Sequence, residues 1–352
     1  MNYAANAPLR TGLLGFGLSG RVFHAPFLAA DPQFVLSIIV TADPGRQAEA
    51  RRLHPGARVV ADADELFDAA GELDLVVIGT PPATHHPLAR RAIGAGLGVV
   101  VDKPFAATSA EGEELVSLAT SAGVPLTVFQ NRRWDADFLT LKGLLDTGAL
   151  AGAFRFESAF EWFKPGGARA WKAEATEAEG GGILFDLGTH LIDQALQLFG
   201  PVATFSAELA TRHPSSAAVD DAFVSLHHAS GVTSHLTMNS LAAQKRPRFR
   251  VLTPSTAYTK WGLDGQEAAL KAGALPTDEG YGVEPASAWG VLGIDGAEGS
   301  LDTVAPERGD YASFYRLLGQ AIATGSALPV DPADAVEVLR LIERLHERGV
   351  RL

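Results

Sequence analysis

The chain has 352 residues, more than most single hydrophobic cores accommodate, so we expect two domains. Hydrophobic residues make up 47% of it and charged residues 20%, as in soluble globular proteins, and no apolar run approaches the ~20 residues of a membrane span. The net charge of -12 argues against a nucleic-acid partner, and the absence of cysteine excludes disulfides, thiolate metal sites and cysteine nucleophiles.

The N-terminal region leads from a predicted strand into a glycine-rich turn. Residues 1–10 lack the cationic start and apolar run of a signal peptide, and the first strand is expected to end at Leu14. The turn consists of Gly15, Phe16, Gly17, Leu18, Ser19 and Gly20. This G-x-G-x-x-G order predicts binding of a dinucleotide pyrophosphate; an ordinary glycine-rich strand–helix turn is the alternative. Pro26 predicts that the following helix is short or irregular.

The residues after the second predicted strand bear on the choice of cofactor. An acidic residue there would bind the 2′-hydroxyl of NAD, whereas a small residue with a nearby arginine admits the 2′-phosphate of NADP. Asp43 fits the first pattern, and Thr41 with Arg46 fits the second. The sequence therefore leaves NADP or NAD open, and we favour NADP with Thr41 and Arg46 as contacts.

Strands and helices alternate as far as about residue 130, which predicts a parallel sheet with helices on both faces. The later strands are expected at residues 34–40, 59–60, 73–78, 99–101 and 126–129, and the helices at 47–53, 63–70, 85–93 and 111–122. Ligands bind at the carboxyl ends of such strands. Cofactor contacts are therefore expected from the glycine turn and from Thr41, Thr80, Pro81, His85, Asp102 and Lys103. A plain surface lysine is the alternative for Lys103.

Beyond residue 130 neighbouring strands replace the alternation, which predicts a large, mainly antiparallel sheet. Strands are expected around residues 154–162, 203–209, 222–228, 233–239, 248–252 and 257–261, and helices at 138–145, 182–199, 311–323 and 331–347. Asp331 is the expected N-cap of the last helix, with Pro332 at its first position. Residues 262–303, rich in glycine and proline, are expected to form an extended loop.

A second glycine-rich stretch precedes the expected helix at residues 182–199. Asp186, His190 and Asp193 follow Gly180-Gly181-Gly182 at a spacing that places all three on one helical face. Acid–base catalysis is favoured, because histidine titrates near neutral pH and a carboxylate can orient it. A structural Asp–His pair and a metal site are the alternatives. We expect no metal, since the surrounding sequence offers no further ligand at a suitable spacing.

Taken together, several stretches resemble the glucose-fructose oxidoreductase / inositol dehydrogenase (Gfo/Idh/MocA) family. They are GFGLSG, GTPPATHHPLA, VDKPF, NRRWD and GGGILFDLGTHLIDQ, and the resemblance includes the closing helices. Asp102 stands where the family usually has glutamate. The segment GFGLSGRVFHAPF is most similar to a subgroup that contains NADP-using scyllo-inositol dehydrogenases.

The resemblance implies an α/β fold, with a doubly wound Rossmann domain over residues 1–129 and a substrate-binding, oligomerising α/β domain over 130–352. The last helix is expected to pack back on the first domain. In catalysis, Lys103 would polarise the reacting hydroxyl, His190 would move its proton, and Asp186 would bind substrate and orient the pair. Residues that could line a sugar site are Arg132, Trp134, Trp162 and Trp171.

These features predict a cytoplasmic NAD(P)-dependent oxidoreductase of a sugar or inositol-like polyol, without nucleic-acid or membrane partners. A homodimer or homotetramer is expected to form through the second sheet. The alternatives are a reductase of a dihydrodiol-like or tetrapyrrole-like substrate and a non-catalytic ligand sensor. A sensor would be expected to have lost Lys103 or His190, and both are present.

Overall fold

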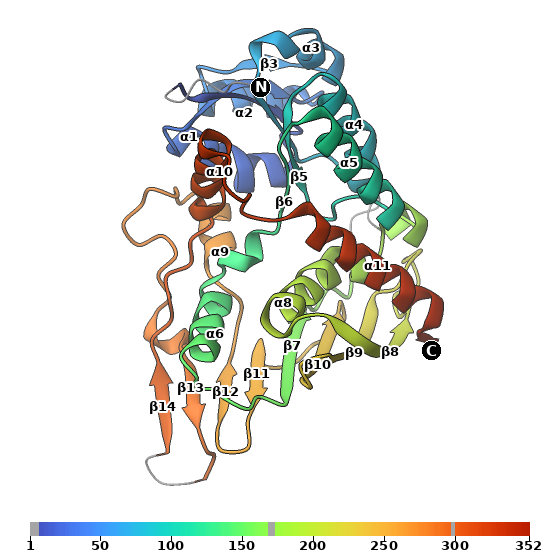
Figure 1. Ribbon diagram of the computed structural model, residues 1–352, viewed down its shortest axis with the longest axis vertical. Helices are drawn as coiled ribbons and strands as arrows, with labels where there is room; N and C mark the ends of the chain where they lie inside the picture. Colours follow the sequence, from blue (N-terminus) through green and yellow to red (C-terminus); the bar gives the residue numbers. More distant parts are fainter. Residues whose placement is uncertain (1–6, 168–172, 297–299) are drawn as a thin grey trace. The chain divides into compact units, whose positions relative to one another are not determined.

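The computed structural model describes residues 7–167, 173–296 and 300–352, and these form two compact units (Figure 1). The first unit comprises residues 1–131, 266–281 and 310–337 as far as they are described, and the second comprises residues 132–265, 282–309 and 338–352. The α/β class predicted from the sequence is confirmed, with a parallel Rossmann sheet in one unit and a mixed sheet in the other.

The first unit is built on a six-stranded parallel sheet with the strand order β3-β2-β1-β4-β5-β6. The strands are β1 (Leu9–Leu14), β2 (Phe34–Val40), β3 (Arg58–Val60), β4 (Leu75–Ile78), β5 (Gly98–Asp102) and β6 (Leu126–Phe129). Every residue of β4 is buried, as expected for a central strand covered on both faces. The order reverses at β1, so the carboxyl ends of β1 and β4 meet at the switch point where such sheets bind ligands.

The helices of this unit follow the prediction with ends displaced by a few residues, except for α9, which lies in the segment that was expected to be a loop. They are α1 (Ala25–Ala30), α2 (Pro44–Leu53), α3 (Ala63–Asp68), α4 (His85–Gly94), α5 (Ser109–Ala122), α9 (Gln266–Lys271) and α10 (Ala312–Thr324). The first helical segment is irregular: a π-helical turn, η1 (Ser19–His24), precedes the short helix α1. The irregular helix predicted from Pro26 is therefore confirmed.

The second unit contains a nine-stranded sheet with the order β14-β13-β12-β11-β7-β10-β9-β8-β15. Its strands are β7 (Arg155–Glu161), β8 (Val202–Ala210), β9 (Asp221–His228), β10 (Thr233–Asn239), β11 (Phe249–Leu252), β12 (Ala257–Lys260), β13 (Gly290–Gly293), β14 (Leu301–Val304) and β15 (Val350–Arg351). Within the described part of this second sheet, only the pairs β7–β10 and β8–β15 are parallel. The mainly antiparallel sheet is thus confirmed.

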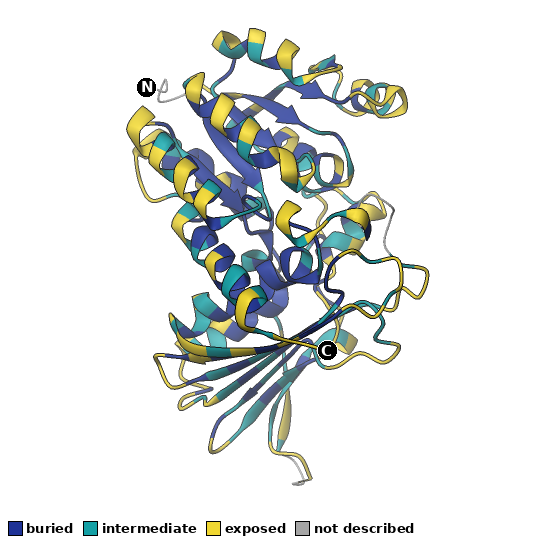
Figure 2. Cartoon of the chain, turned by 90° about the vertical axis from the view of Figure 1, so that its right-hand side faces the viewer, coloured by how far each residue is buried: buried dark blue, intermediate teal, exposed yellow. Residues whose placement is uncertain are grey.

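Burial along β10 alternates strictly, and this separates the two faces of the nine-stranded sheet (Figure 2). Ser234, Leu236 and Met238 are buried on the face against which α8 (Thr189–Phe199) packs. His235 and Thr237 are half-buried on the opposite face, which we call the outer face. Two further helices contribute to this unit, α6 (Ala136–Asp146) and most of α11 (Pro332–Arg348).

The expectation of an extended loop over residues 262–303 is wrong. The segment contains α9, β13 and the start of β14, and β13 pairs with both β12 and β14. Gly290 and Gly293 are the first and last residues of β13 and so are part of the sheet. A Cβ on Gly290 would lie 2.4 Å from the hydroxyl oxygen of Tyr258, so the tyrosine ring of β12 fits across β13 only because that position has no side chain.

Candidate active site

The three glycines of the first turn have three different surroundings. Gly15 has a φ of 95°, a conformation that favours glycine, and it ends β1 beside Gly79 at the end of β4. A Cβ on Gly20 would lie 1.9 Å from the carbonyl oxygen of Gly15, so only glycine lets the helix pack this closely on the strand. A Cβ on Gly17 would meet only the Arg46 guanidinium, at 3.8 Å. The space above Gly17 therefore suits a pyrophosphate approaching the backbone.

The side chains between these glycines point in different directions. Phe16 is buried and packs edge-on against His54, with ring centroids 5.9 Å apart. Leu18 is 44% exposed, and the Ser19 hydroxyl donates a short hydrogen bond to Asp102. Phe16 can therefore contribute only its backbone to a cofactor site, whereas Leu18 lies on the surface.

At the end of β2, Asp43 and Arg46 have different surroundings. The Asp43 carboxylate caps α2 by accepting the backbone N–H of Arg46 at 2.8 Å. Thr41 is buried, and the exposed Arg46 side chain extends beside Gly17. The acidic group is thus used within the fold, and the positive charge lies beside the glycine turn.

The loops after β4 and β5 are joined by a buried histidine. His85 lies with Nδ1 2.7 Å from the Pro104 carbonyl oxygen and Nε2 2.8 Å from the Thr80 carbonyl oxygen. Burial lowers the pKa of this ring, against the opposing effects of the Asp102 charge and the two carbonyls. His85 therefore fixes the two loops to each other, while Pro81 is exposed beside it.

Asp102 is the last residue of β5 and Lys103 follows it, and the Lys103–Pro104 peptide bond is cis. One Asp102 oxygen accepts the Lys103 backbone N–H at 2.8 Å, and the other faces Ser19 and His24. Burial alone would raise the pKa of Asp102, but His24, Ser19 and Lys103 outweigh it and hold the pKa at about 2. Asp102 is therefore a carboxylate at any physiological pH. Lys103 is half-buried at the same strand end.

In the second unit, the triple glycine stretch is closely fitted to its neighbours. A Cβ on Gly181 would lie 2.2 Å from the Ala175 carbonyl oxygen, and Gly182, with a φ of 89°, lies against Ala218 and Val219. A π-helical turn, η6 (Leu184–Gly188), follows and continues into α8. Such turns are frequent at functional sites, and η1 at the first glycine turn is a second example in this chain.

Asp186, His190 and Asp193 differ in burial and in the contacts that they make. Asp186 is half-buried, whereas His190 and Asp193 are 4% and 2% exposed. Asp193 accepts two hydrogen bonds from the Arg133 guanidinium, at 2.6 and 2.9 Å. Asp193 therefore anchors α8, and Asp186 and His190 remain as the catalytic candidates of this helix.

A buried polar network holds α8 in place behind His190. The side chain of Gln194 donates to the Arg132 carbonyl oxygen at 2.9 Å and accepts from the Arg248 guanidinium at 2.7 Å. Arg248 also donates to Ser158 on β7 at 2.7 Å and lies 3.3 Å from Asp137. No local pattern in the sequence indicates Gln194, Arg248, Ser158 or Asp137, because their partners come from distant segments.

The residues predicted to line a sugar site are partly engaged within the fold. Arg132 is buried, pairs with Asp135 at 3.2 Å and places its guanidinium 4.7 Å from the Phe160 ring centre. Trp162 is half-buried and lies 3.5 Å from the Lys164 ammonium, measured to the ring centre. Trp134 is half-buried, and Trp171 lies outside the described residues. Arg132 is thus built into the unit, whereas the two described tryptophans keep exposed surface.

Within the described residues, no three His, Cys, Asp or Glu side chains are grouped so that they could hold a metal ion. Nor does any helix in that part of the chain have the length and apolar character needed to cross a membrane.

Comparison with known proteins assigns both halves of the sequence to one family. Residues 9–130 match the oxidoreductase family with an NAD-binding Rossmann fold, and residues 138–254 match the GFO/IDH/MocA C-terminal domain. The chain belongs to the Gfo/Idh/MocA oxidoreductases. The resemblance noted from the sequence is therefore confirmed, and with it the expectation of a nicotinamide-dependent enzyme.

Several known proteins resemble the chain over more than half of its length. The scyllo-inositol 2-dehydrogenase (NADP(+)) IolW of Bacillus subtilis is 34% identical over 96% of this chain and 93% of its own. A D-apiose dehydrogenase of Paraburkholderia graminis is 33% identical over 62% of this chain and 55% of its own. The crystal structure of an oxidoreductase from Bacillus cereus, 30% identical, superimposes with a TM-score of 0.84 over 96% of each chain.

Proposed function

We propose that this protein is a dehydrogenase that moves hydride between NADP and a secondary alcohol or ketone of a sugar or inositol-like polyol. The observation that carries this proposal is that one chain contains both a complete glycine turn, in the Rossmann unit, and a buried histidine, His190, which follows the triple glycine stretch in the other unit. The likeness to a scyllo-inositol dehydrogenase over nearly the whole chain supports the substrate class.

The Rossmann unit would hold the cofactor, which supplies or accepts the hydride when bound. Its glycine turn and the residues Thr41, Thr80, Pro81, His85 and Asp102 would surround it. Arg46 is the residue proposed to select NADP, because its guanidinium beside Gly17 could pair with a 2′-phosphate. NADP as the coenzyme of a similar dehydrogenase agrees with this choice.

The chain's own contribution to the reaction is proton transfer and positioning. Lys103 is proposed to hydrogen-bond the reacting oxygen and lower its proton affinity, His190 to accept or return the hydroxyl proton, and Asp186 to bind substrate beside it. Lys103 belongs to the first unit and His190 to the second. Trp134 and Trp162 are the described candidates for the substrate wall.

Replacement of the two proton-handling residues tests this proposal. With scyllo-inositol and a panel of related polyols, His190→Ala and Lys103→Ala should each lower kcat/KM by roughly 10²- to 10⁴-fold. His227→Ala and Lys142→Ala remove the same side-chain types from exposed positions and should leave kcat/KM unchanged. Unaltered turnover in the His190 variant would contradict the assignment. Turnover of aromatic alcohols alone would contradict the polyol class.

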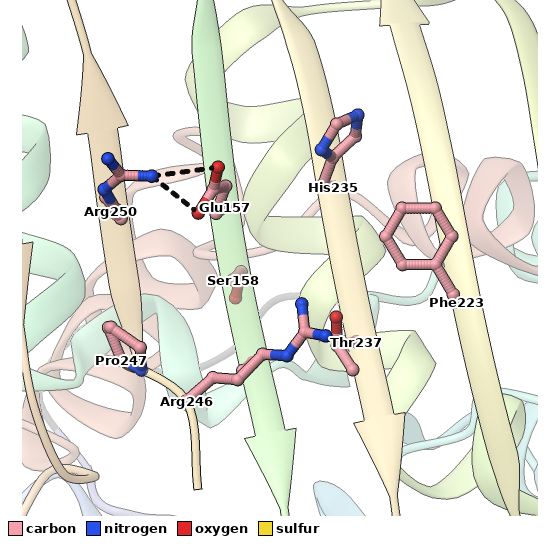
Figure 3. A pocket seen from close by; sticks show the side chains of 9 residues that line it. Glu157, Ser158, Phe223, His235, Thr237, Arg246, Pro247 and Arg250 are labelled. Carbon is pink, nitrogen blue, oxygen red and sulfur yellow. Dashed lines mark hydrogen bonds and ion pairs between the residues drawn. The ribbon is translucent and has the colours of Figure 1, made fainter.

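The outer face of the nine-stranded sheet is proposed to join subunits into a homodimer or homotetramer. Figure 3 shows its side chains, where Arg250 donates to Glu157 at 3.4 Å and His235, Thr237 and Phe223 occupy the neighbouring strands. This mixture of charge and apolar surface on a broad sheet suits a self-complementary contact.

The cytoplasmic location that the sequence predicts is also part of the proposal.

A further inference from the structure

A line of three buried or nearly buried polar side chains runs through the first unit to the residue beside Lys103. It starts at Tyr315 on α10, which is fully buried and has its hydroxyl oxygen 2.6 Å from Nδ1 of His24. His24 is also fully buried, at the end of the π-helical turn, and its Nε2 lies 3.7 Å from Oδ2 of Asp102. The glycine turn, β5 and α10 are therefore connected by side chains that the sequence analysis did not combine.

The position of the proton on His24 follows from its neighbours. Burial, together with the Asp102 charge, raises the pKa of Tyr315 well above its ordinary value, so the phenol keeps its proton. A phenol hydroxyl can donate or accept, whereas the Asp102 carboxylate, 3.7 Å from Nε2, can only accept. A neutral imidazole at this position therefore carries its proton on Nε2, and its Nδ1 accepts the hydrogen bond from the Tyr315 hydroxyl. The Phe129 ring, 4.5 Å from the imidazole centre, packs against this arrangement.

Asp102 forms hydrogen bonds with two loops, the glycine turn and the loop that begins at Lys103. Its Oδ2 faces His24 and accepts the hydrogen bond from Ser19 in the glycine turn, while its Oδ1 accepts the backbone N–H of Lys103. Gly79 leaves room for Ser19 and His24 to lie this close to Asp102, since a Cβ on Gly79 would lie 3.3 Å from both the Ser19 hydroxyl and the His24 ring. One carboxylate thus ties the glycine turn to the backbone of the lysine.

We propose that Tyr315 and His24 are positioning residues that act through Asp102. Tyr315 holds His24 in the Nε2–H tautomer, and His24 orients the Asp102 carboxylate. Through its two hydrogen bonds, Asp102 fixes the position of Ser19 relative to the Lys103 backbone. The effect on turnover rests on the proposed function of Lys103. The tautomer is a property of the folded chain by itself and can be measured without any substrate.

The tautomer is tested by ¹⁵N NMR of histidine-labelled protein at a pH of about 9, where an ordinary imidazole is neutral. The His24 signals are those that disappear in His24→Gln. They should show a protonated Nε2 and an unprotonated Nδ1 in the wild type, and a substantial Nδ1–H population in Tyr315→Phe. A proton on Nδ1 in the wild type, or no change in the variant, overturns the proposal.

Turnover of scyllo-inositol with NADP tests the coupling to Lys103. Tyr315→Phe should lower kcat about 10-fold with little change in KM, and Tyr311→Phe, the same deletion one turn earlier near the start of α10, should not. If Tyr315 acts through Asp102, the Asp102→Asn/Tyr315→Phe double variant should be no slower than Asp102→Asn alone. If the double variant instead lost kcat by the product of the two single effects, the proposal would be overturned. An inactive wild type would instead count against the proposed function, and the NMR result would still decide the tautomer.

Discussion

Two residues that follow the same strand show how local contacts narrow a choice of cofactor. Asp43 and Arg46 gave opposite indications from the sequence, because an acid suits NAD and an arginine suits NADP. The structure places the Asp43 carboxylate on the N-terminus of α2 and the Arg46 guanidinium beside Gly17. The acidic residue has a structural partner, so the arginine carries more weight in the proposal.

Replacing Arg46 with alanine should weaken NADPH binding about 10- to 100-fold, the range expected for loss of a charge-assisted contact with a phosphate. The dissociation constant of NADH should change less than about twofold. Arg52→Ala removes an exposed arginine from the same helix and serves as the matched control. Titration of both cofactors by fluorescence measures the effect, and equal weakening of NADPH and NADH would argue against a 2′-phosphate contact.

Among the elements, the turn from β1 into the π-helical turn depends most on the absence of side chains. Gly20→Ala places a methyl group 1.9 Å from the Gly15 carbonyl oxygen, so backbone must move. We expect the unfolding free energy to fall by roughly 1–3 kcal/mol. Urea denaturation of the Rossmann unit, followed in the full chain, measures the change.

Gly143→Ala is the matched control for this substitution. Gly143 lies inside α6, and a Cβ there would meet nothing within 4 Å. Alanine should therefore stabilise the helix by about 0.5–1 kcal/mol, since it loses less backbone entropy than glycine. If both variants were equally stable, close packing of Gly20 on β1 would not be what requires a glycine.

The elements that the sequence predicted well are those with a continuous apolar run or a strict alternation. Residues 34–40, 126–129 and 233–239 form strands with the predicted ends. Prediction was wrong for residues 262–303, because Gly290 and Gly293 indicate a loop unless the tyrosine packed over one of them is known. The two π-helical turns were also beyond reach, since their hydrogen bonds depend on tertiary packing.

The candidate site divides in the same way. The glycine turn, Lys103 and His190 could be proposed from the sequence because each occurs in a short motif. His24 and Tyr315 could not, because 291 positions separate them in the sequence and neither has a local pattern. Asp193 shared the spacing of the catalytic candidates, and only its pairing with Arg133 shows that it anchors the helix.

At the scale of the whole molecule, the proposed assembly makes a direct prediction about the outer face. Phe223→Glu places a carboxylate on each of two facing surfaces in a symmetric dimer, so a single substitution adds two like charges. We expect sedimentation equilibrium to show a shift toward monomer at micromolar concentration. Leu53→Glu, at a residue of the first unit that is 42% exposed, should leave the assembly intact. A Phe223 variant with unchanged mass would exclude this face.

The first unit is assembled from segments that lie far apart in the sequence, and this has a consequence for synthesis of the chain. Tyr315 packs against Phe27, Phe34 and Phe129, and Phe314 also contacts Phe129, so apolar surface of the N-terminal segment is covered by residues made much later. At ribosomal rates, the interval between Phe129 and Tyr315 is on the order of 10–40 s. We therefore expect the aromatic patch of the nascent Rossmann sheet to stay uncovered for that interval. A fragment cut after residue 131 would keep the patch exposed permanently.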